Sequence, residues 1–416
     1  MKKYVLLFLV LYIVQTTVAQ TVYQTNVLAP NIKTLQIHQP NDTFGLPIIE
    51  LNSSDVLQIQ FDEMSHDIKS FNYQVFQCNK DWTPSSLIYT EYIDGFDTGM
   101  IEDYESSVNT TYLYTNYRFE IPNSDISFTK SGNYVVQIYE DDNRDKPLAQ
   151  ACFYVVEPSV SISGNIRGNT DTELNGRMQQ LDFEVALNGY PVQNPNTEID
   201  VVVRQNNRSD NEVRNIKPTY LRGQSLLYQN NKALIFEGGY EYRRFDISSI
   251  YVLSERVEKI EYDQTHYQVY LYPDKIKPFS AYQTDFDVDG GFVINIQNAF
   301  DNSDVEADYF NVHFSIPREE PFFDGQIYIG GEYNYNLLNE ASRMQYDFTS
   351  GEYFKTLLLK QGGYNYQYWF LPKGQQKADV ERIEGSFWQT ENQYAIYVYH
   401  RPWGGRYDKL IGIKIL

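Results

Sequence analysis

Basic residues are scarce in this 416-residue sequence, which carries 34 lysines and arginines against 55 aspartates and glutamates, a formal net charge of −21. Nucleic-acid binding depends on clustered lysine and arginine side chains that displace counterions from phosphates. The acidic balance therefore argues against a nucleic-acid partner. Net charge bears on solubility and association, and it leaves the fold open.

Catalytic motifs are missing as well. The sequence has no Gly-x-Ser-x-Gly elbow, no His-Glu-x-x-His pair and no Gly-x-x-x-x-Gly-Lys phosphate loop. Its histidines stand singly on expected strands or loops, where packing or surface roles are the rule. They are His38, His66, His266, His313 and His400. We expect no catalytic residue and no cofactor. The prediction of a hydrolase would be supported only by the abundance of carboxylates, and the distance between any two of them depends on the fold.

Long apolar runs are confined to the N-terminus. Lys2 and Lys3 precede an apolar run over residues 4–14, and short side chains follow at 17–19, which together predict a secretory signal peptide over residues 1–19. The run is too short for a permanent membrane anchor, the alternative interpretation. We expect a mature chain from Gln20 in an extracytoplasmic space. Its 32 basic and 55 acidic residues give a net charge of −23.

Only two cysteines occur, Cys78 and Cys152, both within expected strands of the N-terminal region. In an oxidising compartment they could form a disulfide. The alternative is a pair of buried thiols that pack as small apolar groups. Sequence spacing does not decide between the two, because a disulfide needs a specific Cα separation.

Strand signals dominate what is present. The chain has 37 tyrosines and 24 phenylalanines, side chains that suit a pleated, half-buried surface, and helical periodicity is almost absent. Residues 308–316 alternate strictly, with Phe310, Val312, Phe314 and Ile316 on one face. Short strands between turns rich in Asn, Asp, Gly and Pro predict an all-β protein of tandem immunoglobulin-like, early-set β-sandwich domains.

The length exceeds one domain, and two proline-bearing stretches suggest boundaries. Pro158 follows one expected strand, and residues 317–321 follow another. We therefore expect an N-terminal β-sandwich over 20–158, a middle β domain over 159–318 and a C-terminal β-sandwich over 319–416. The middle domain could divide again near Pro273.

Three carboxylates at alternate positions, Asp285, Asp287 and Asp289, resemble the opening of a calcium loop. The twelfth position of such a loop, which needs a glutamate, is Ile296, and a strand pattern follows where a helix is required. We therefore favour an acidic turn, with Asp289 and Gly290 at its centre, over a metal site.

The stretch 401–407 concentrates cationic and aromatic side chains in an acidic protein. Arg401, Trp403, Arg406 and Tyr407 surround a turn made by proline and glycine. Trp, Tyr and Arg dominate interface hot spots, so this loop is our candidate partner-binding surface. In the alternative, Trp403 closes the end of a sandwich and the arginines pair with nearby acids.

Several blocks resemble a known family. The C-terminal blocks are residues 359–368, 383–394 and 399–412, and the N-terminal blocks are residues 71–87, 91–96 and 131–134. They are similar to the type IX secretion system plug family of Bacteroidota. The resemblance implies a periplasmic protein, associated with the outer membrane, that binds the translocon barrel and seals its periplasmic end when the barrel is idle.

A weaker resemblance concerns the tyrosine-rich stretch 330–335 and the turns after it. Their succession of strands and turns is similar to that of early-set domains, which include some starch-binding modules. It implies an alternative function, extracytoplasmic carbohydrate binding, because aromatic faces stack on sugar rings. Tyr333 or Tyr335 stands where those modules usually carry a tryptophan. Such a binder should expose two or three aromatic rings in one plane.

Overall fold

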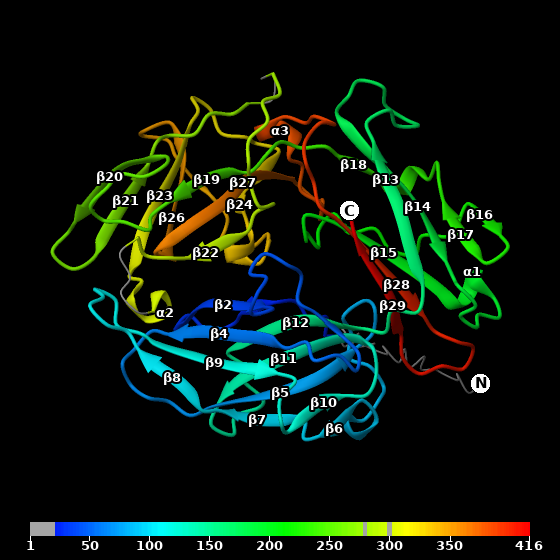
Figure 1. Cartoon of the computed structure of the whole chain (residues 1–416). Coiled ribbons are helices and arrows are strands. Elements are labelled where there is room, and N and C mark those ends of the chain that lie inside the picture. Colours follow the sequence, from blue (N-terminus) through cyan, green and yellow to red (C-terminus); the bar gives the residue numbers. More distant parts are fainter. Residues whose placement is uncertain (1–20, 278–280, 298–301) are drawn as a thin grey trace, which may run out of the picture.

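The computed structural model describes residues 21–277, 281–297 and 302–416, in which nearly every regular element is a β-strand (Figure 1). The expected leader, residues 1–19, and the expected start at Gln20 lie outside the described residues. The strands surround three separate hydrophobic cores, and we call the resulting parts the first, second and third β-bodies. The all-β prediction is confirmed.

The first β-body is a two-sheet sandwich. Its elements are β1 (Asn26–Val27), β2 (Ile32–His38), β3 (Ile48–Glu50), β4 (Leu57–Glu63), β5 (Phe71–Cys78), η1 (Tyr89–Glu91), β6 (Ile93–Gly95), β7 (Thr98–Ile101), β8 (Asp103–Ser106), β9 (Thr115–Ile121), β10 (Ile126–Phe128), β11 (Gly132–Glu140) and β12 (Ala149–Val156). One main sheet has the order β1-β12-β11-β5-β7, with β3 parallel to β12, and the other β2-β4-β9-β8, while β6 and β10 form a separate two-stranded sheet. Phe61, Tyr117 and Phe153 belong to the core between them.

The second β-body combines strands from two distant parts of the chain. Its elements are β13 (Ser161–Arg167), β14 (Met178–Ala186), α1 (Pro195–Glu198), β15 (Ile199–Gln205), β16 (Tyr220–Arg222), β17 (Ser225–Tyr228), η2 (Lys232–Leu234), β18 (Ile235–Glu237), β28 (Tyr394–His400) and β29 (Lys409–Ile415). The sheet β13-β14-β17-β16, with β18 beside β14, faces the sheet β15-β28-β29. Leu181 and Ile396 meet in the core between these sheets.

The third β-body occupies the chain between those two parts. Its elements are β19 (Arg243–Asp246), β20 (Val257–Tyr262), β21 (Tyr267–Leu271), β22 (Phe292–Ile294), α2 (Ser303–Glu306), β23 (Tyr309–Pro317), β24 (Gly325–Gly330), η3 (Glu332–Asn334), β25 (Gln345–Asp347), β26 (Glu352–Lys360), β27 (Gly362–Pro372) and α3 (Glu381–Glu384). The sheet β20-β21-β23-β26-β25 faces β27 and its neighbours β19, β22 and β24. The predicted alternation is confirmed, because Phe310, Val312, Phe314 and Ile316 are all buried in the core.

The boundary expected between residues 318 and 319 does not follow the strand pairing. β23, which ends at Pro317, pairs along its length with β26, so residues on both sides of the boundary build one sheet. β15, in the range expected for the middle domain, pairs with β28 in the range expected for the C-terminal one, Val201 opposite Val398. The ranges 159–318 and 319–416 therefore do not correspond to separate sandwiches. Pairing between strands so far apart in sequence depends on tertiary contacts that local patterns do not contain.

Each β-body packs against the other two, and together they form a closed ring in Figure 1. The first and second meet in an apolar cluster in which the rings of Tyr154 and Tyr397 stack with centroids 4.6 Å apart. The second and third meet where the Glu237 carboxylate accepts the backbone N–H of Val380 at 3.0 Å.

The first and third β-bodies meet around a buried ion pair. The Lys360 Nζ lies 2.6 Å from Asp62 Oδ2, and the hydroxyl of Tyr309 donates to the same oxygen at 2.6 Å. These three pairwise contacts leave no β-body attached by a linker alone. No helix in the described part of the chain is long and apolar enough to cross a membrane.

Candidate functional site

The loop between β28 and β29 is fixed to the first β-body by its arginines. Arg401 forms an ion pair with Asp408 at 2.9 Å and donates to Asn79 Oδ1 at 2.7 Å. Arg406 forms an ion pair with Glu91 at 2.9 Å. Both arginines thus pair with nearby acids, and both reach across to the first β-body.

Trp403 lies at the tip of this loop and is 92 % exposed, so it does not close the end of the sandwich. Tyr407, at the base, is half-buried, with the Lys130 ammonium 5.6 Å from its ring centre. On the segment of the first β-body that Arg406 contacts, Ile88 is also exposed. The loop therefore presents an aromatic side chain from a fixed base.

The two cysteines do not form a disulfide: both thiols are free. β11 lies between the strands that carry them, with Cys78 opposite Asn133 and Cys152 opposite Val135. Two strand spacings separate their backbones by about 10 Å, beyond the roughly 7 Å between Cα atoms that a disulfide tolerates. The structure agrees with the alternative interpretation, in which the two thiols pack as small apolar groups. Both belong to the apolar cluster between the first and second β-bodies.

The three aspartates of the calcium-like motif do not converge. Asp285 forms an ion pair with Arg244 at 3.2 Å, and Asp287 accepts the backbone N–H of Asp289 at 2.9 Å. Burial, then repulsion from Asp287, raises the pKa of Asp289 to about 8. Across residues 21–277, 281–297 and 302–416, no three His, Cys, Asp or Glu side chains are placed to hold a metal ion. The segment turns at Asp289 and Gly290, both of positive φ.

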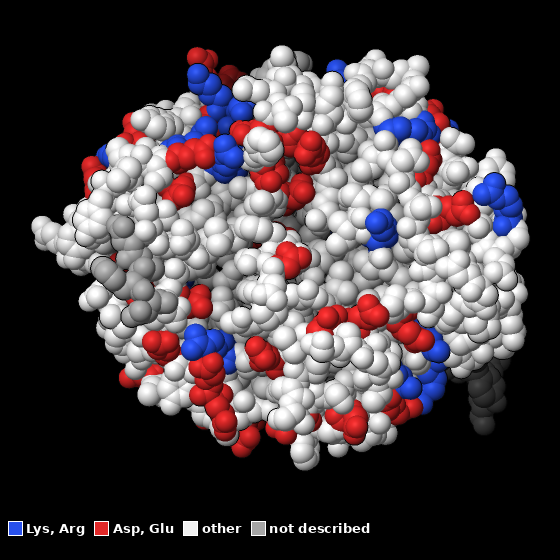
Figure 2. All heavy atoms as spheres, viewed as in Figure 1, with Lys and Arg blue, Asp and Glu red and all other residues white. Residues whose placement is uncertain are grey.

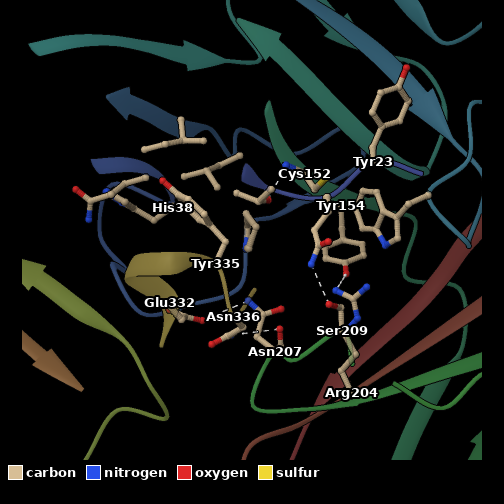
Figure 3. A pocket seen from close by; sticks show the side chains of 18 of the residues that line it. Tyr23, His38, Cys152, Tyr154, Arg204, Asn207, Ser209, Glu332, Tyr335 and Asn336 are labelled. Atoms are coloured by element: carbon tan, nitrogen blue, oxygen red, sulfur yellow. Dashed lines mark hydrogen bonds between the residues drawn. The ribbon is translucent and has the colours of Figure 1, made fainter. Parts of the chain in front are cut away.

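A cavity of about 200 Å³ lies where the three β-bodies meet (Figure 3). Leu35 and Tyr154 of the first β-body, Arg204 of the second, and Phe292 and Tyr335 of the third contribute to its wall. The cavity therefore exists only when all three β-bodies are in place.

The charged groups of the cavity belong to the second and third β-bodies. Arg204 and Arg214 both pair with Glu212, and Arg204 also donates to the Tyr154 hydroxyl at 3.1 Å. Burial, then the neighbouring Arg204, lowers the pKa of Arg214. The Glu332 carboxylate accepts a hydrogen bond from Asn207 Nδ2 at 3.3 Å, and burial raises its pKa to about 7.

Sequence reasoning did not find this cavity, because its wall comes from segments far apart in the chain. The one part of the cavity that the sequence pattern marks is the stretch 330–335, whose tyrosines predict sugar stacking and not a cavity wall. Tyr335 instead packs against the core of the first β-body, and the buried Tyr333 hydroxyl has no hydrogen-bond partner in the described structure. Neither ring belongs to an exposed plane.

Charge is uneven along the chain. Residues 21–157 contain 20 acidic and 7 basic residues, a net charge of −13, whereas the rest of the mature chain has 35 and 25, a net charge of −10. Acidic side chains are spread over the first β-body in Figure 2. Most of the net charge thus lies on about one third of the molecule.

Comparisons with known proteins agree with the resemblance seen in the sequence. The family model described as the type 9 secretion system plug protein 1st domain matches residues 32–157, nearly the whole first β-body. A crystal structure of a hypothetical protein from Parabacteroides merdae is similar over 95 % of this chain and 100 % of its own, with 40 % identity and a TM-score of 0.93. A Pseudomonas fluorescens alkylpurine DNA glycosylase aligns over 30 % of each chain with 11 % identity and a TM-score of 0.16. This TM-score is too low to indicate a shared fold. The comparison with curated proteins found no match.

Proposed function

This chain belongs to the type IX secretion system plug protein family, and we propose that it is a non-catalytic periplasmic plug. In this proposal it binds the periplasmic end of the outer-membrane translocon barrel and seals it when no substrate is passing. It is attached to the outer membrane through protein contacts alone, and it needs no cofactor.

The observation that carries the proposal is the match of the plug-domain model to the first β-body. The closed packing of the three β-bodies supports it. A seal has to resist deformation while it covers a wide opening. A body whose parts are joined by buried contacts has little conformational entropy to lose on docking, so more of its contact energy is available for binding.

We propose the loop 401–407 as one contact with the barrel. Trp403 is the exposed anchor, and Arg401 and Arg406 fix the loop through their contacts with Asn79 and Glu91 of the first β-body. A loop that is fixed before binding loses less conformational freedom when its exposed aromatic side chain becomes buried in a partner.

Affinity purification tests the function. A tagged form of the mature chain, purified from envelopes solubilised in mild detergent, should bring down a very large outer-membrane barrel in near-stoichiometric amount. Removing the protein from cells should make the envelope leak small molecules through the unsealed barrel. Purification without any outer-membrane protein, together with an unchanged envelope, contradicts the proposal.

A further inference from the structure

The central cavity contains hydrogen-bond acceptors that lack donors. Asn336 is 3 % exposed, and its Oδ1 has no partner in the described structure. Its Nδ2 reaches the backbone oxygens of Asn206 and Asn207 only at 3.5 Å. A buried amide oxygen without a donor is costly to keep and implies a missing donor. The Glu332 carboxylate, on the same wall, accepts a single hydrogen bond from the residues that the structure describes.

The backbone around these acceptors is unusual. Two segments face each other here, and each has two consecutive residues of positive φ: Asn206 and Asn207 at 51° each, Tyr335 at 61° and Asn336 at 54°. Asparagine tolerates this conformation, but a bulky tyrosine adopts it rarely and at a cost. Such outliers cluster at binding sites, where the surrounding structure holds them.

From this arrangement we propose that the cavity binds a small organic amine, whose ammonium group donates to the Glu332 carboxylate and to Asn336 Oδ1. An ammonium group supplies three donors and a positive charge, which matches one carboxylate and one free amide oxygen. The apolar part of the ligand would lie among the aromatic and aliphatic side chains of the wall. These include Leu35, Phe292 and Tyr335.

The arginines of the cavity wall are already paired with Glu212, whereas Glu332 has no ion pair in the described part of the chain. Arg204 and Arg214 share Glu212, so those three carry one net positive charge, which the ionised Glu332 balances. Once Glu332 is ionised, an ammonium group beside it is stabilised. Among the described residues of the wall, a divalent cation would meet one carboxylate, that of Glu332, and hard cations are usually held by several oxygen ligands. The proposal does not depend on the plug function.

The test uses the purified mature chain and 2-phenylethylamine as the probe, by calorimetry and thermal melting at pH 8. 2-Phenylethanol and phenylacetate contain the same phenyl ring, with a hydroxyl group or a carboxylate in place of the ammonium group. The amine should bind and raise the melting temperature, and the alcohol and the acid should not. Binding should weaken from pH 8 to pH 6, because burial raises the pKa of Glu332 to about 7 and protonation removes its charge.

Glu332→Gln keeps the size of the side chain and should weaken amine binding by about tenfold or more. Asn336→Asp, which supplies a second carboxylate, should keep or strengthen it. Glu340→Gln, at an exposed site outside the cavity, is the matched control and should bind as the wild type does. Equal binding of amine and alcohol, unchanged binding by Glu332→Gln, or a thermal shift with calcium chloride alone would each overturn the proposal.

Discussion

Lys360 and Asp62 form an ion pair between the third and first β-bodies, with Nζ 2.6 Å from Oδ2 and both side chains almost fully buried. Two further groups satisfy the same carboxylate, the hydroxyl of Tyr309 and the amide of Asn116. The ammonium group also lies 4.2 Å from the ring centre of Tyr114. The pair therefore belongs to a buried hydrogen-bonded network and not to a solvated surface.

Lys360→Met should destabilise the protein strongly, because it leaves the Asp62 carboxylate buried without its counter-charge. The loss of a single partner in a buried pair costs about 3–5 kcal/mol. The double variant Asp62→Asn/Lys360→Met should recover a large part of this loss, because it removes both charges. Denaturant unfolding measures the free energies. A single variant as stable as the wild type would show that the pair does not join the β-bodies.

Stability should fall as pH rises from about 4 to 8, in part because of Asp289. Burial raises its pKa to about 8, so the folded state holds a proton that the unfolded state has already released. One such proton changes the free energy of unfolding by at most about 1.4 kcal/mol per pH unit. Asp289→Asn should flatten this slope in urea titrations at several pH values. Asp94→Asn, at an exposed position, should leave the slope as it is.

Trp403→Ala should weaken capture of the barrel without destabilising the protein. The side chain is 92 % exposed, so the melting temperature should change little. Loss of an interface anchor costs on the order of 2 kcal/mol, or roughly thirtyfold in affinity. Phe348→Ala, at an 81 % exposed aromatic on another loop, is the control and should leave capture unchanged. Full capture by a folded Trp403→Ala variant would remove this loop from the contact surface.

Both cysteines should be free thiols that react only after unfolding. Cys78 is buried, and burial raises the pKa of Cys152 to about 12, which suppresses its reactive thiolate. Iodoacetamide should leave the native protein unmodified and add two groups in denaturant without reductant. Mass spectrometry distinguishes the outcomes, because a protein that gains no group in denaturant would contain the disulfide that the structure lacks.

Local patterns predicted the strands but not their grouping. The alternation from Phe310 to Ile316 is a property of neighbouring residues, so the sequence alone revealed that strand and its buried face. The pairing of β15 with β28 joins residues on either side of the whole third β-body, and no local periodicity encodes it. For the same reason, the sequence does not indicate that Glu332 and Asn336 belong to one site. They lie in a common cavity wall only where the three β-bodies meet.

The insertion of the third β-body into the second sets an order of assembly along the chain. β15 and the sheet around β14 are synthesised early, but the strands that complete their sandwich lie in the last 23 residues, 394–416. Until those residues emerge, β15 keeps an open edge and an uncovered apolar face. The first and third β-bodies contain all their own strands and can close without the C-terminus, so the second is completed last. A chain shortened by its final two strands would therefore lose the second β-body and, with it, one wall of the central cavity.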